Sequence, residues 1–562
     1  MEIGDEHDEP QFVSDTSAST FMAAGPDAFH RSVAGKFRLA AGQALPQLEI
    51  RVHNLSLSVK TPVVHDTAPG AVSSELPTLP TVLRRAVAKS VGACIPPFLK
   101  QGGRRNAANR YILRDISGAF KPGTMTLVLG QPGSGKSSLL QLLSGRFPLE
   151  SEDVTVDGDV MYNDESRELL ARRLPQFAAY VPQQDLHLST LTVRETHEFA
   201  HTCSTAHFNK HVEELLGHAR RSEDNAQAQT TARSLLRHLP QITLELLGLQ
   251  QCSSTIIGGQ LQRGVSGGER KRVTTGEMLV GFKLALFLDS ITTGLDSAAA
   301  FDIVSTLRGR ARSFGQTVVA ALLQPAPEVF ELFDDVLLLM GGRVAYHGPV
   351  KEVRGYFESL GFYCPPGRDF ADFLMDLGTD DQLRYQTDSS QEPPRTAKQF
   401  ATRFSGSSIY QHNLQQLETP VDANMVDSAH KYMDSIPEFQ QGFVASTLTL
   451  VRREMLVLSR NVAFVVGRAV MTVVMGLLYA STFYNFKATN VQVIMGVVFS
   501  VIFFVSLGQA AQIPTLFEAR DIFYRQRRAN FYRSSSFVLA STLSHIPVAL
   551  FETFVFGSLI YW

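Results

Sequence analysis

The residues of this sequence best suited to chemistry form a glycine-rich run that ends in lysine and serine. Gly130, Gly135, Lys136 and Ser137 have the spacing G-x-x-x-x-G-K-S within TLVLGQPGSGKSSLLQLLSG, residues 126–145. A strand is predicted over 126–129 and a helical pattern follows the run, which is the context of a phosphate-binding P-loop. Glycines let the backbone curl with its N–H groups toward phosphate oxygens, and the helix N-terminus adds a positive dipole.

This run predicts a site for a nucleotide and Mg²⁺. The ammonium of Lys136 is expected at the terminal phosphates, and the hydroxyl of Ser137 on the metal. A chance glycine-rich turn is the alternative, and the order of strand, loop, Lys-Ser and helix argues against it. The expected nucleotide-binding residues of the run are Gly130, Gly133, Ser134, Gly135, Lys136, Ser137 and Ser138.

A second strand is predicted over ALFLD, residues 285–289, and it ends in Asp289. An aspartate there can hold Mg²⁺ through water, although an apolar strand that ends in Asp is weak support alone. Before it stands RGVSGGERKRVTTGEMLV, residues 263–280, in which Ser266 opens a predicted helix. A helix N-terminus can bind phosphate, but the P-loop of this domain already serves that purpose. We therefore interpret the stretch as capping a nucleotide that a second, similar domain holds.

The P-loop, VSGGE (265–269), the FLD strand end and TTGLD (292–296), in that order, resemble an ATP-binding cassette domain. Further stretches are similar to the G subfamily in its full-length, pleiotropic drug resistance form: LTVRET (191–196), ALLQPAPEVFELFDDVLLL (321–339) and RDIFYRQRRANFYRSSSF (520–537). The resemblance covers about residue 46 to the end. It implies ATP and Mg²⁺ as ligands, ATP hydrolysis coupled to transport of a small molecule, and a nucleotide domain that precedes a membrane domain.

The resemblance also implies roles for individual residues. Gln183 in YVPQQD is expected to sense Mg²⁺ and the membrane domain, so the expected Mg²⁺ set is Ser137, Gln183 and Asp289. The signature residues expected to act on the opposing site are Ser266, Gly267, Gly268 and Glu269, with Ser266 and Gly268 at its γ-phosphate. Asp296 is expected in the loop that joins the two sites.

Two positions depart from the pattern of the family. Ser290 stands where a glutamate base is usual, and Leu323 stands where a histidine usually steadies the γ-phosphate. No carboxylate then remains beside Asp289 to orient the attacking water. Two losses at one centre predict a site that binds ATP and turns it over slowly, which resembles the degenerate composite site of full-length members. The intact signature would complete the other site on a partner domain.

The adenine-stacking residue is not evident from the sequence. The usual position in the first strand holds Val59 and Lys60, and neither is aromatic. Tyr111 is a candidate substitute, and a packed surface tyrosine is the other interpretation.

Composition narrows the class of protein. The chain has 562 residues with a formal net charge of −2, so no charge bias points to nucleic acid as a partner. The mean hydropathy of −0.01 is high for a purely soluble protein. The 4 cysteines are scattered without paired spacing, which favours a reduced compartment and neither a disulfide frame nor a metal site. The acidic, polar first 20 residues show no cleavable signal peptide.

The elements that must position these motifs alternate between strand-like and helix-like stretches from Tyr111 to about 377, which predicts an α/β domain with a mainly parallel sheet. Before it, 48–59 is a predicted strand and 60–108 an insertion rich in proline and basic residues. We divide the chain into a disordered tail (1–45), the nucleotide-binding domain (46–377), a linker (378–440) and a partial, all-α transmembrane domain (441–562).

Three apolar segments predict membrane spans, at about 461–484, 491–513 and 536–562. Arg468 is costly within the first span unless it lies near one face, and Glu552 in the third either faces a protein interior, which we favour, or marks a substrate path. The arginines that flank the spans are Arg452, Arg453 and Arg460 before the first, and Arg520, Arg525, Arg527, Arg528 and Arg533 before the third, against Lys487 alone between the first two. This asymmetry predicts a cytosolic nucleotide domain of a multi-pass protein, which we expect in the plasma membrane.

The favoured function is the ATP-binding half of an ATP-driven efflux transporter for a small molecule. The rival is a membrane-anchored, nucleotide-binding regulatory module without transport activity. A soluble cassette ATPase acting on DNA or ribosomes is discounted by the apolar segments and by the absence of a basic face. Because family members have more spans and two copies of each domain, the resemblance predicts a truncated chain. It would need a second nucleotide-binding domain and further transmembrane helices, from a C-terminal half or from another half.

Overall fold

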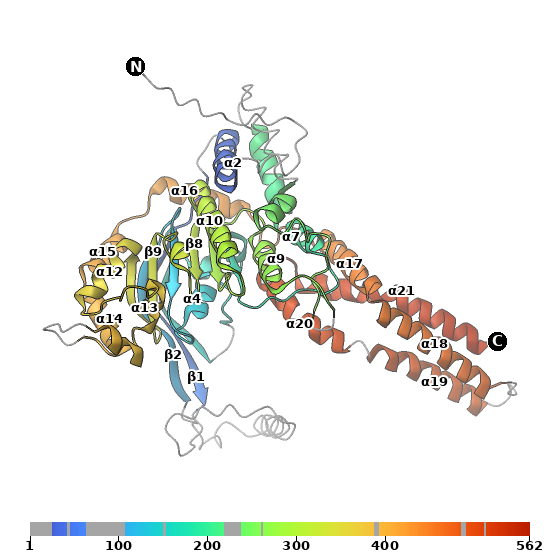
Figure 1. Ribbon diagram of the computed structural model, residues 1–562. Coiled ribbons are helices and arrows are strands. Elements are labelled where there is room, and N and C mark those ends of the chain that lie inside the picture. Colours follow the sequence, from blue (N-terminus) through green and yellow to red (C-terminus); the bar gives the residue numbers. More distant parts are fainter. Residues whose placement is uncertain are drawn as a thin grey trace, which may run out of the picture.

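The computed structural model describes residues 25–41, 45–62, 107–149, 153–218, 238–259, 262–386, 393–484, 491–510 and 513–561. The insertion expected over 60–108 therefore lies almost entirely outside the described residues, as does the tail before residue 25. Figure 1 shows an α/β part, from which a group of long helices extends toward the C-terminus.

The larger sheet has 6 strands in the order β10-β9-β3-β8-β7-β6. It is parallel except for β10, which pairs antiparallel with β9 at the edge, so the predicted mainly parallel sheet is confirmed. Every residue of β3, β7 and β8 is buried, as expected of strands covered on both faces. The strands are β3 (Met125–Leu129), β6 (Ala178–Val181), β7 (Ala285–Asp289), β8 (Thr317–Ala321), β9 (Asp335–Met340) and β10 (Arg343–Pro349).

A second, antiparallel sheet has the order β2-β1-β4-β5. Of this sheet the sequence predicted only the strand at 48–59, which is β1. The first helix after the P-loop is held against it, because Tyr162 Oη donates to Leu143 O at 2.6 Å. The elements are β1 (Ile50–Pro62), β2 (Ala107–Phe120), β4 (Val154–Tyr162), β5 (Glu165–Ser166) and α4 (Lys136–Leu143).

The buried apolar residues of the strands and of the helices around them form two clusters. The main core unites both sheets, whereas a smaller cluster joins α7 and α9 to the chain at 244–265. The helices of this part are α5 (Arg167–Leu170), α6 (Leu174–Phe177), α7 (Val193–His218), α9 (Gly267–Leu279), α10 (Ser297–Phe314), α11 (Pro327–Phe330), α12 (Val350–Ser359) and α13 (Phe370–Asp376).

Two segments are more ordered than their composition predicted. Within the tail expected to be disordered, α2 (Pro26–Ala41) lies on α10 with Phe29 and Val33 buried (Figure 1). The expected linker contains a 3-10 helix (Asp380–Tyr385) and the helices α14 (Ala397–Ser405), α15 (Ser408–Glu418) and α16 (Ala423–Ser435). Phe400 and Phe404 bury their rings against the α/β core, so a four-residue apolar spacing overrode the polar composition.

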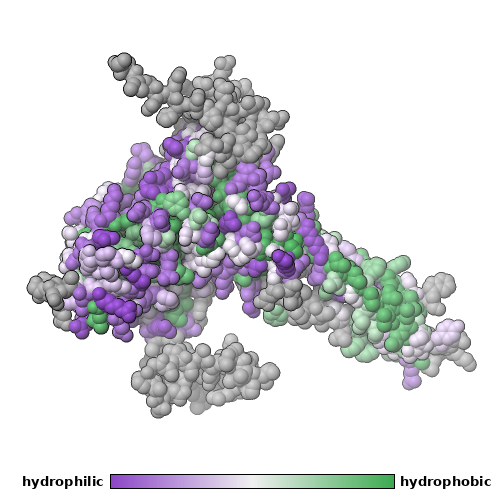
Figure 2. Space-filling model, in the orientation of Figure 1, coloured by the Kyte–Doolittle hydropathy of each residue, from purple (hydrophilic) through white to green (hydrophobic). Residues whose placement is uncertain are grey.

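The C-terminal part is helical, with α17 (Phe443–Arg460), α18 (Val462–Thr482), α19 (Val491–Ala510), α20 (Ile513–Arg528) and α21 (Ser534–Tyr561). Within the part of the chain that the structure describes, α18 and α21 are long and apolar enough to cross a membrane, with mean hydropathies of 2.0 and 1.6. The second expected span, 491–513, corresponds to α19, in which the apolar helical stretch Val491–Phe504 is shorter. Figure 2 shows the apolar surface of these helices at the end far from the α/β part.

The two charged residues within the expected spans pair with each other. Arg468 on α18 donates through Nη2 to Glu552 Oε2 on α21. Both side chains lie between the helices, with exposed fractions of 12% and 9%. Glu552 therefore faces the protein interior, as we favoured from the sequence.

Candidate nucleotide site and its link to the membrane helices

The P-loop has the backbone that a phosphate cradle requires. The chain leaves β3 at Leu129 and enters α4 at Lys136. Between them Gly130, Gly133 and Gly135 take positive φ angles of 148°, 81° and 99°, a region open to glycine at little cost. A Cβ on Gly135 would lie 3.1 Å from Ile112 O and closer still to Leu113, so β2 also requires glycine there.

The side chains of this loop fit a triphosphate. Lys136 Nζ donates to the carbonyls of Gly130 and, at 3.0 Å, Gln131, so the ammonium lies over the loop. Burial lowers its pKa, and the nearby charge of Asp289 partly offsets that. Ser134 Oγ is buried without a hydrogen-bond partner in the described part of the chain. A buried cation and a free buried hydroxyl beside curled backbone N–H groups suit phosphate oxygens.

The three residues expected around Mg²⁺ line one cavity. Ser137, Gln183 and Asp289 all contribute to a space of about 500 Å³. Asp289 ends β7 and accepts a hydrogen bond from Tyr180 Oη at 3.1 Å, and Tyr180 Oη accepts one from Gln141 Nε2 at 3.1 Å. Carboxylate, hydroxyl and amide oxygens are the ligands that Mg²⁺ prefers. Sequence reasoning missed Tyr180 and Gln141, although Tyr180 directly precedes the VPQQD stretch.

The two positions that depart from the family pattern lie at one edge of the sheet. Ser290 follows β7 and Leu323 follows β8, and these neighbouring parallel strands end side by side. Ser290 is buried, has a left-handed φ of 56°, and donates its backbone N–H to Ala321 O at 2.8 Å. Its hydroxyl lies 3.4 Å from Asp289 Oδ1. Leu323 is partly exposed and offers no polar atom.

The signature stretch forms the start of α9. Ser266 caps the helix: its Oγ accepts from Glu269 N at 3.2 Å, while Glu269 Oε2 accepts from Ser266 N at 2.8 Å. This reciprocal capping box fixes the helix N-terminus. A Cβ on Gly267 would meet no atom within 4 Å, whereas one on Gly268 would lie 3.1 Å from Leu295 Cδ2. The signature is thus packed against TTGLD, and Asp296 follows as the residue before α10.

Tyr111 lies beside the P-loop. It pairs with Ser58 across β1 and β2, directly before Ile112, whose carbonyl approaches Gly135. Its ring is 42% exposed, and the guanidinium of Arg114 lies 4.5 Å from the ring centroid. The ring is therefore accessible at this rim, and the arginine covers part of it.

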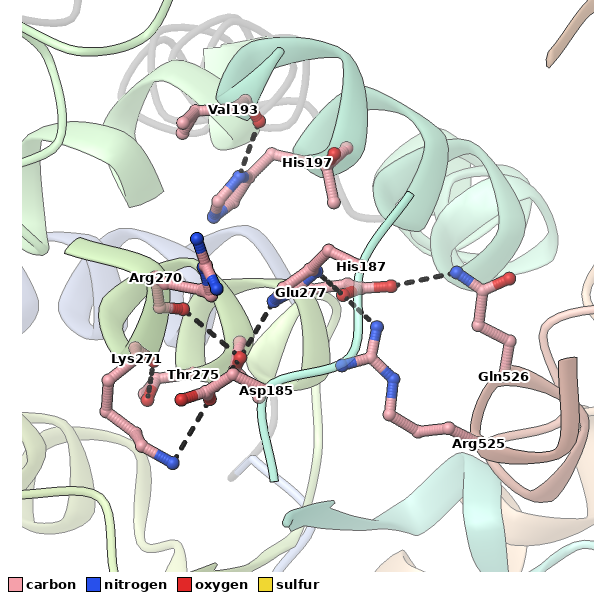
Figure 3. Close-up of polar contacts among 12 residues, drawn as sticks. Asp185, His187, Val193, His197, Arg270, Lys271, Thr275, Glu277, Arg525 and Gln526 are labelled. Carbon is pink, nitrogen blue, oxygen red and sulfur yellow. Dashed lines mark hydrogen bonds and ion pairs between the residues drawn. The ribbon is translucent and has the colours of Figure 1, made fainter. Parts of the chain in front are cut away.

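A polar path leaves Gln183 along α9. Lys271 Nζ donates to Gln183 O at 2.6 Å and pairs with Asp185 Oδ1 at 3.1 Å. The same carboxylate accepts from Thr274 Oγ1 at 2.6 Å. Thr274 Oγ1 in turn contacts His187 Nε2 at 2.8 Å. Figure 3 shows several of these side chains gathered around α9.

The path reaches the C-terminal helices at Glu277. This fully buried carboxylate contacts His187 Nδ1 at 3.2 Å, Arg525 Nη2 at 2.6 Å and Gln526 Nε2 at 3.0 Å (Figure 3). Burial alone would raise the pKa of Glu277, but the charge of Arg525 and the hydrogen bond from His187 outweigh it and hold the pKa at about 2. Burial lowers the pKa of His187, which favours its neutral form.

Two further contacts secure the same junction. Gln526 Oε1 accepts from Arg453 Nη1 at 2.8 Å and from Tyr532 Oη at 2.9 Å, and Arg453 lies 4.4 Å from the ring centroid of Phe199 on α7. At the end of α17, Arg460 donates to both oxygens of Glu195 at 2.6 and 2.7 Å. Hydrogen bonds from Arg460 lower the pKa of Glu195 to about 2. Sequence reasoning assigned no role to these pairs.

Comparison with known proteins gives matches in both halves. A family model described as "ABC transporter" matches residues 113–293, and models described as "ABC-2 type transporter" match 323–462 and 445–562. The chain is 34% identical over 539 residues to ABC transporter G family member 31 of Arabidopsis thaliana, covering 93% of this chain and 36% of that protein. It is 33% identical over 545 residues to ABC transporter G family member 35 of Oryza sativa subsp. japonica, covering 92% and 35%. The chain therefore spans about a third of the length of these relatives.

Replacing Glu277 by alanine should destabilise the full chain by about 3–5 kcal/mol, because Arg525 then keeps a buried charge without its partner. The double change Glu277→Gln, Arg525→Met should cost less, since neither partner remains charged. Chemical denaturation in detergent measures both. The exposed Glu331→Ala serves as the control, and a loss for Glu277→Ala no larger than that of the control would contradict the buried pair.

The same carboxylate predicts a pH dependence. The folded pKa of about 2 lies below the ordinary 4.5, so the stabilising contribution is fully present above pH 4.5 and is lost as the pH falls toward 2. The difference in unfolding free energy between the wild type and Glu277→Gln should therefore shrink over that interval. Unfolding curves recorded from pH 6 downward test this, and a difference that stays constant would argue against the depressed pKa.

Proposed function

This chain belongs to the ATP-binding cassette transporters, and from that premise we propose that it is the ATP-binding half of an ATP-driven efflux transporter of the pleiotropic drug resistance type. One observation carries the proposal. A P-loop with the backbone of a phosphate cradle shares a cavity with Gln183. Hydrogen bonds and ion pairs run from Gln183 to Glu277 and on to Arg525 of the membrane-type helices. The relatives named as transporters support the same function.

ATP is proposed to lie on the P-loop. Backbone N–H groups of 130–135 and Lys136 would hold its phosphates. Ser134 Oγ, which has no hydrogen-bond partner among the described residues, would donate to them as well. Mg²⁺, when bound, supplies positive charge that stabilises the charge of the terminal phosphates. Ser137, Gln183 and Asp289 would hold it, because they line the same cavity. For adenine we propose Tyr111 as the accessible aromatic surface.

Hydrolysis in this site is proposed to be slow. The hydroxyl of Ser290 is too weakly basic to take a proton from water, and its hydrogen-bonding partner is Asp289. Leu323 offers no hydrogen bond to a phosphate. Ser266–Glu269 at the start of α9 would instead complete the composite site of a second nucleotide-binding domain.

Coupling to the membrane is proposed to run through α9. The signature lies at the N-terminus of this helix and Glu277 near its C-terminal end. A rigid movement of α9 caused by a nucleotide at the signature would therefore act on Arg525 and Gln526 of α20. The network around Glu277 is buried, so the movement cannot be absorbed by solvent-exposed side chains.

The remaining partners follow from this assignment. We propose a second nucleotide-binding domain, further transmembrane helices and a small-molecule substrate, with no nucleic acid. We also propose a cytosolic α/β part and a plasma-membrane location.

The rival function is a membrane-anchored regulatory module. The two functions are separated by ATP-dependent substrate flux in vesicles that contain the assembled transporter. The proposed function predicts that Lys136→Ala abolishes this flux. A regulatory anchor predicts that the flux continues when this chain no longer binds ATP.

Lys136→Ala should weaken Mg·ATP binding by removing a charge-assisted contact worth roughly 1.5–3 kcal/mol, or about tenfold or more in affinity. Isothermal calorimetry on the full chain measures the difference. The exposed Lys351→Ala is a matched loss of one ammonium and should bind ATP as the wild type does. Equal affinities for all three proteins would rule out the P-loop as the ATP site.

A Ser290→Glu, Leu323→His double change should raise ATP turnover well above either single change, since a general base typically contributes roughly 10²–10⁴-fold. The measurement is phosphate release from this site in an assembly where the composite site forms. Adding Lys136→Ala should abolish the gain. If the unmodified site already releases phosphate at the rate of the repaired one, the slow-site assignment is wrong.

A further inference from the structure

The cavity beside the nucleotide site has a second wall that belongs to the C-terminal helices. Its volume is about 500 Å³, and Ser137, Gln183 and Asp289 form part of one side. Arg525 and Arg528, near the end of α20, contribute to the other. Residues nearly 400 positions apart thus line one space together with the proposed Mg²⁺ ligands.

Arg525 in this wall is buried without being satisfied. Its side chain is 8% exposed, and only Nη2 is paired, with Glu277. Nε and Nη1 are both buried and have no hydrogen-bond partner among the residues that the structure describes. A guanidinium has five N–H donors, and those on Nε and Nη1 of Arg525 remain available to the oxygens of an anion.

The other charged residues that line the cavity, apart from Arg528, already have hydrogen-bond or ion-pair partners. Arg146 donates hydrogen bonds to the carbonyl oxygens of Ser144, Pro175 and Ala178. Two carboxylates also line the cavity: Asp289 accepts a hydrogen bond from Tyr180, which lines the cavity as well, and Asp521 pairs with Arg520 at 3.3 Å.

Arg528 differs from these residues. It is exposed and has no ion pair with any residue in the described ranges. The positive charge still available in the cavity therefore lies on the α20 side.

We propose that this cavity binds inorganic phosphate, with Arg525 and Arg528 as its protein ligands. The proposal rests on the proposed nucleotide function, because phosphate cleaved from a nucleotide would leave beside Asp289 and Ser137, which line the same space. Phosphate of the cytosol has the same chemistry and could enter from outside. An anion here would share the Arg525 guanidinium with Glu277, so its presence would weaken the contact that ties α20 to α9.

Binding of ³²P-labelled inorganic phosphate to the purified full chain tests the proposal. Lys136→Ala is used as the background, because it removes phosphate binding by the P-loop itself. In that background we expect saturable binding that Arg528→Gln weakens at least tenfold. The double change Glu277→Gln, Arg525→Met should weaken it similarly. Since Arg528 is exposed, its replacement keeps the test valid even if the buried double change fails to fold.

Arg527→Gln is the matched control. It removes the same charge from the same helix, but Arg527 bonds Ser534 Oγ at 3.1 Å, stacks on Phe439 and does not line the cavity. Phosphate binding equal to that of the background supports the proposal. Absence of phosphate binding in the background, equal binding by all variants, or equal weakening by Arg527→Gln and Arg528→Gln would each overturn it.

A second arm identifies the source of the phosphate and keeps the two proposals apart. The wild type and Arg528→Gln are given either [γ-³²P]ATP or labelled phosphate, and retained phosphate is separated from ATP. Label retained from ATP and lost in Arg528→Gln identifies cleaved phosphate; label retained only from free phosphate identifies the cytosol. ATP affinity is measured separately, so failure to bind ATP contradicts the proposed function, whereas failure to bind phosphate with intact ATP binding contradicts this inference alone.

Discussion

The contact between Glu277 and Arg525 is the constraint on which the junction of the two halves depends. A fully buried carboxylate is tolerable only when a charge and hydrogen bonds replace water, and α20 supplies both through Arg525 and Gln526. Neither helix can move away from the other without leaving a charge in an apolar interior.

Such a pair contributes more to the relation between parts than to overall stability. Desolvation of two charges largely offsets their attraction, so well-packed apolar residues could be equally stable. What the ion pair adds is direction. Ser266 and Glu277 lie at opposite ends of α9 and are separated by about 16 Å at 1.5 Å per residue. One rigid helix thus carries both Ser266, which is expected to contact a nucleotide, and Glu277, which contacts the membrane-type helices. No flexible loop lies between these two residues.

The sequence predicted those elements whose pattern lies in a short run of consecutive residues. The strand ALFLD was predicted at the bounds that β7 has, and the P-loop context of strand, loop and helix is confirmed. The helices α2 and α14–α16 were missed because short apolar stripes are diluted by polar neighbours. The Glu277–Arg525 pair joins residues 248 positions apart, and no periodicity encodes such a partner. The role of Gln183 came from family resemblance, that of Ser266 came first from its place at a predicted helix start, and both roles stay predictions.

The separation of binding from chemistry explains how Ser290 can coexist with an intact cradle. The P-loop is built by β3, α4 and the glycines between them, whereas position 290 lies after β7 and is held by a backbone bond to Ala321. Replacing glutamate by serine there changes neither the glycine conformations nor Lys136. It also leaves the path from Gln183 to Glu277 in place, since that path uses α9 and not the end of β7. Under the proposed function, a site without a glutamate base would therefore keep both the phosphate cradle and the contacts that lead through α9 to α20.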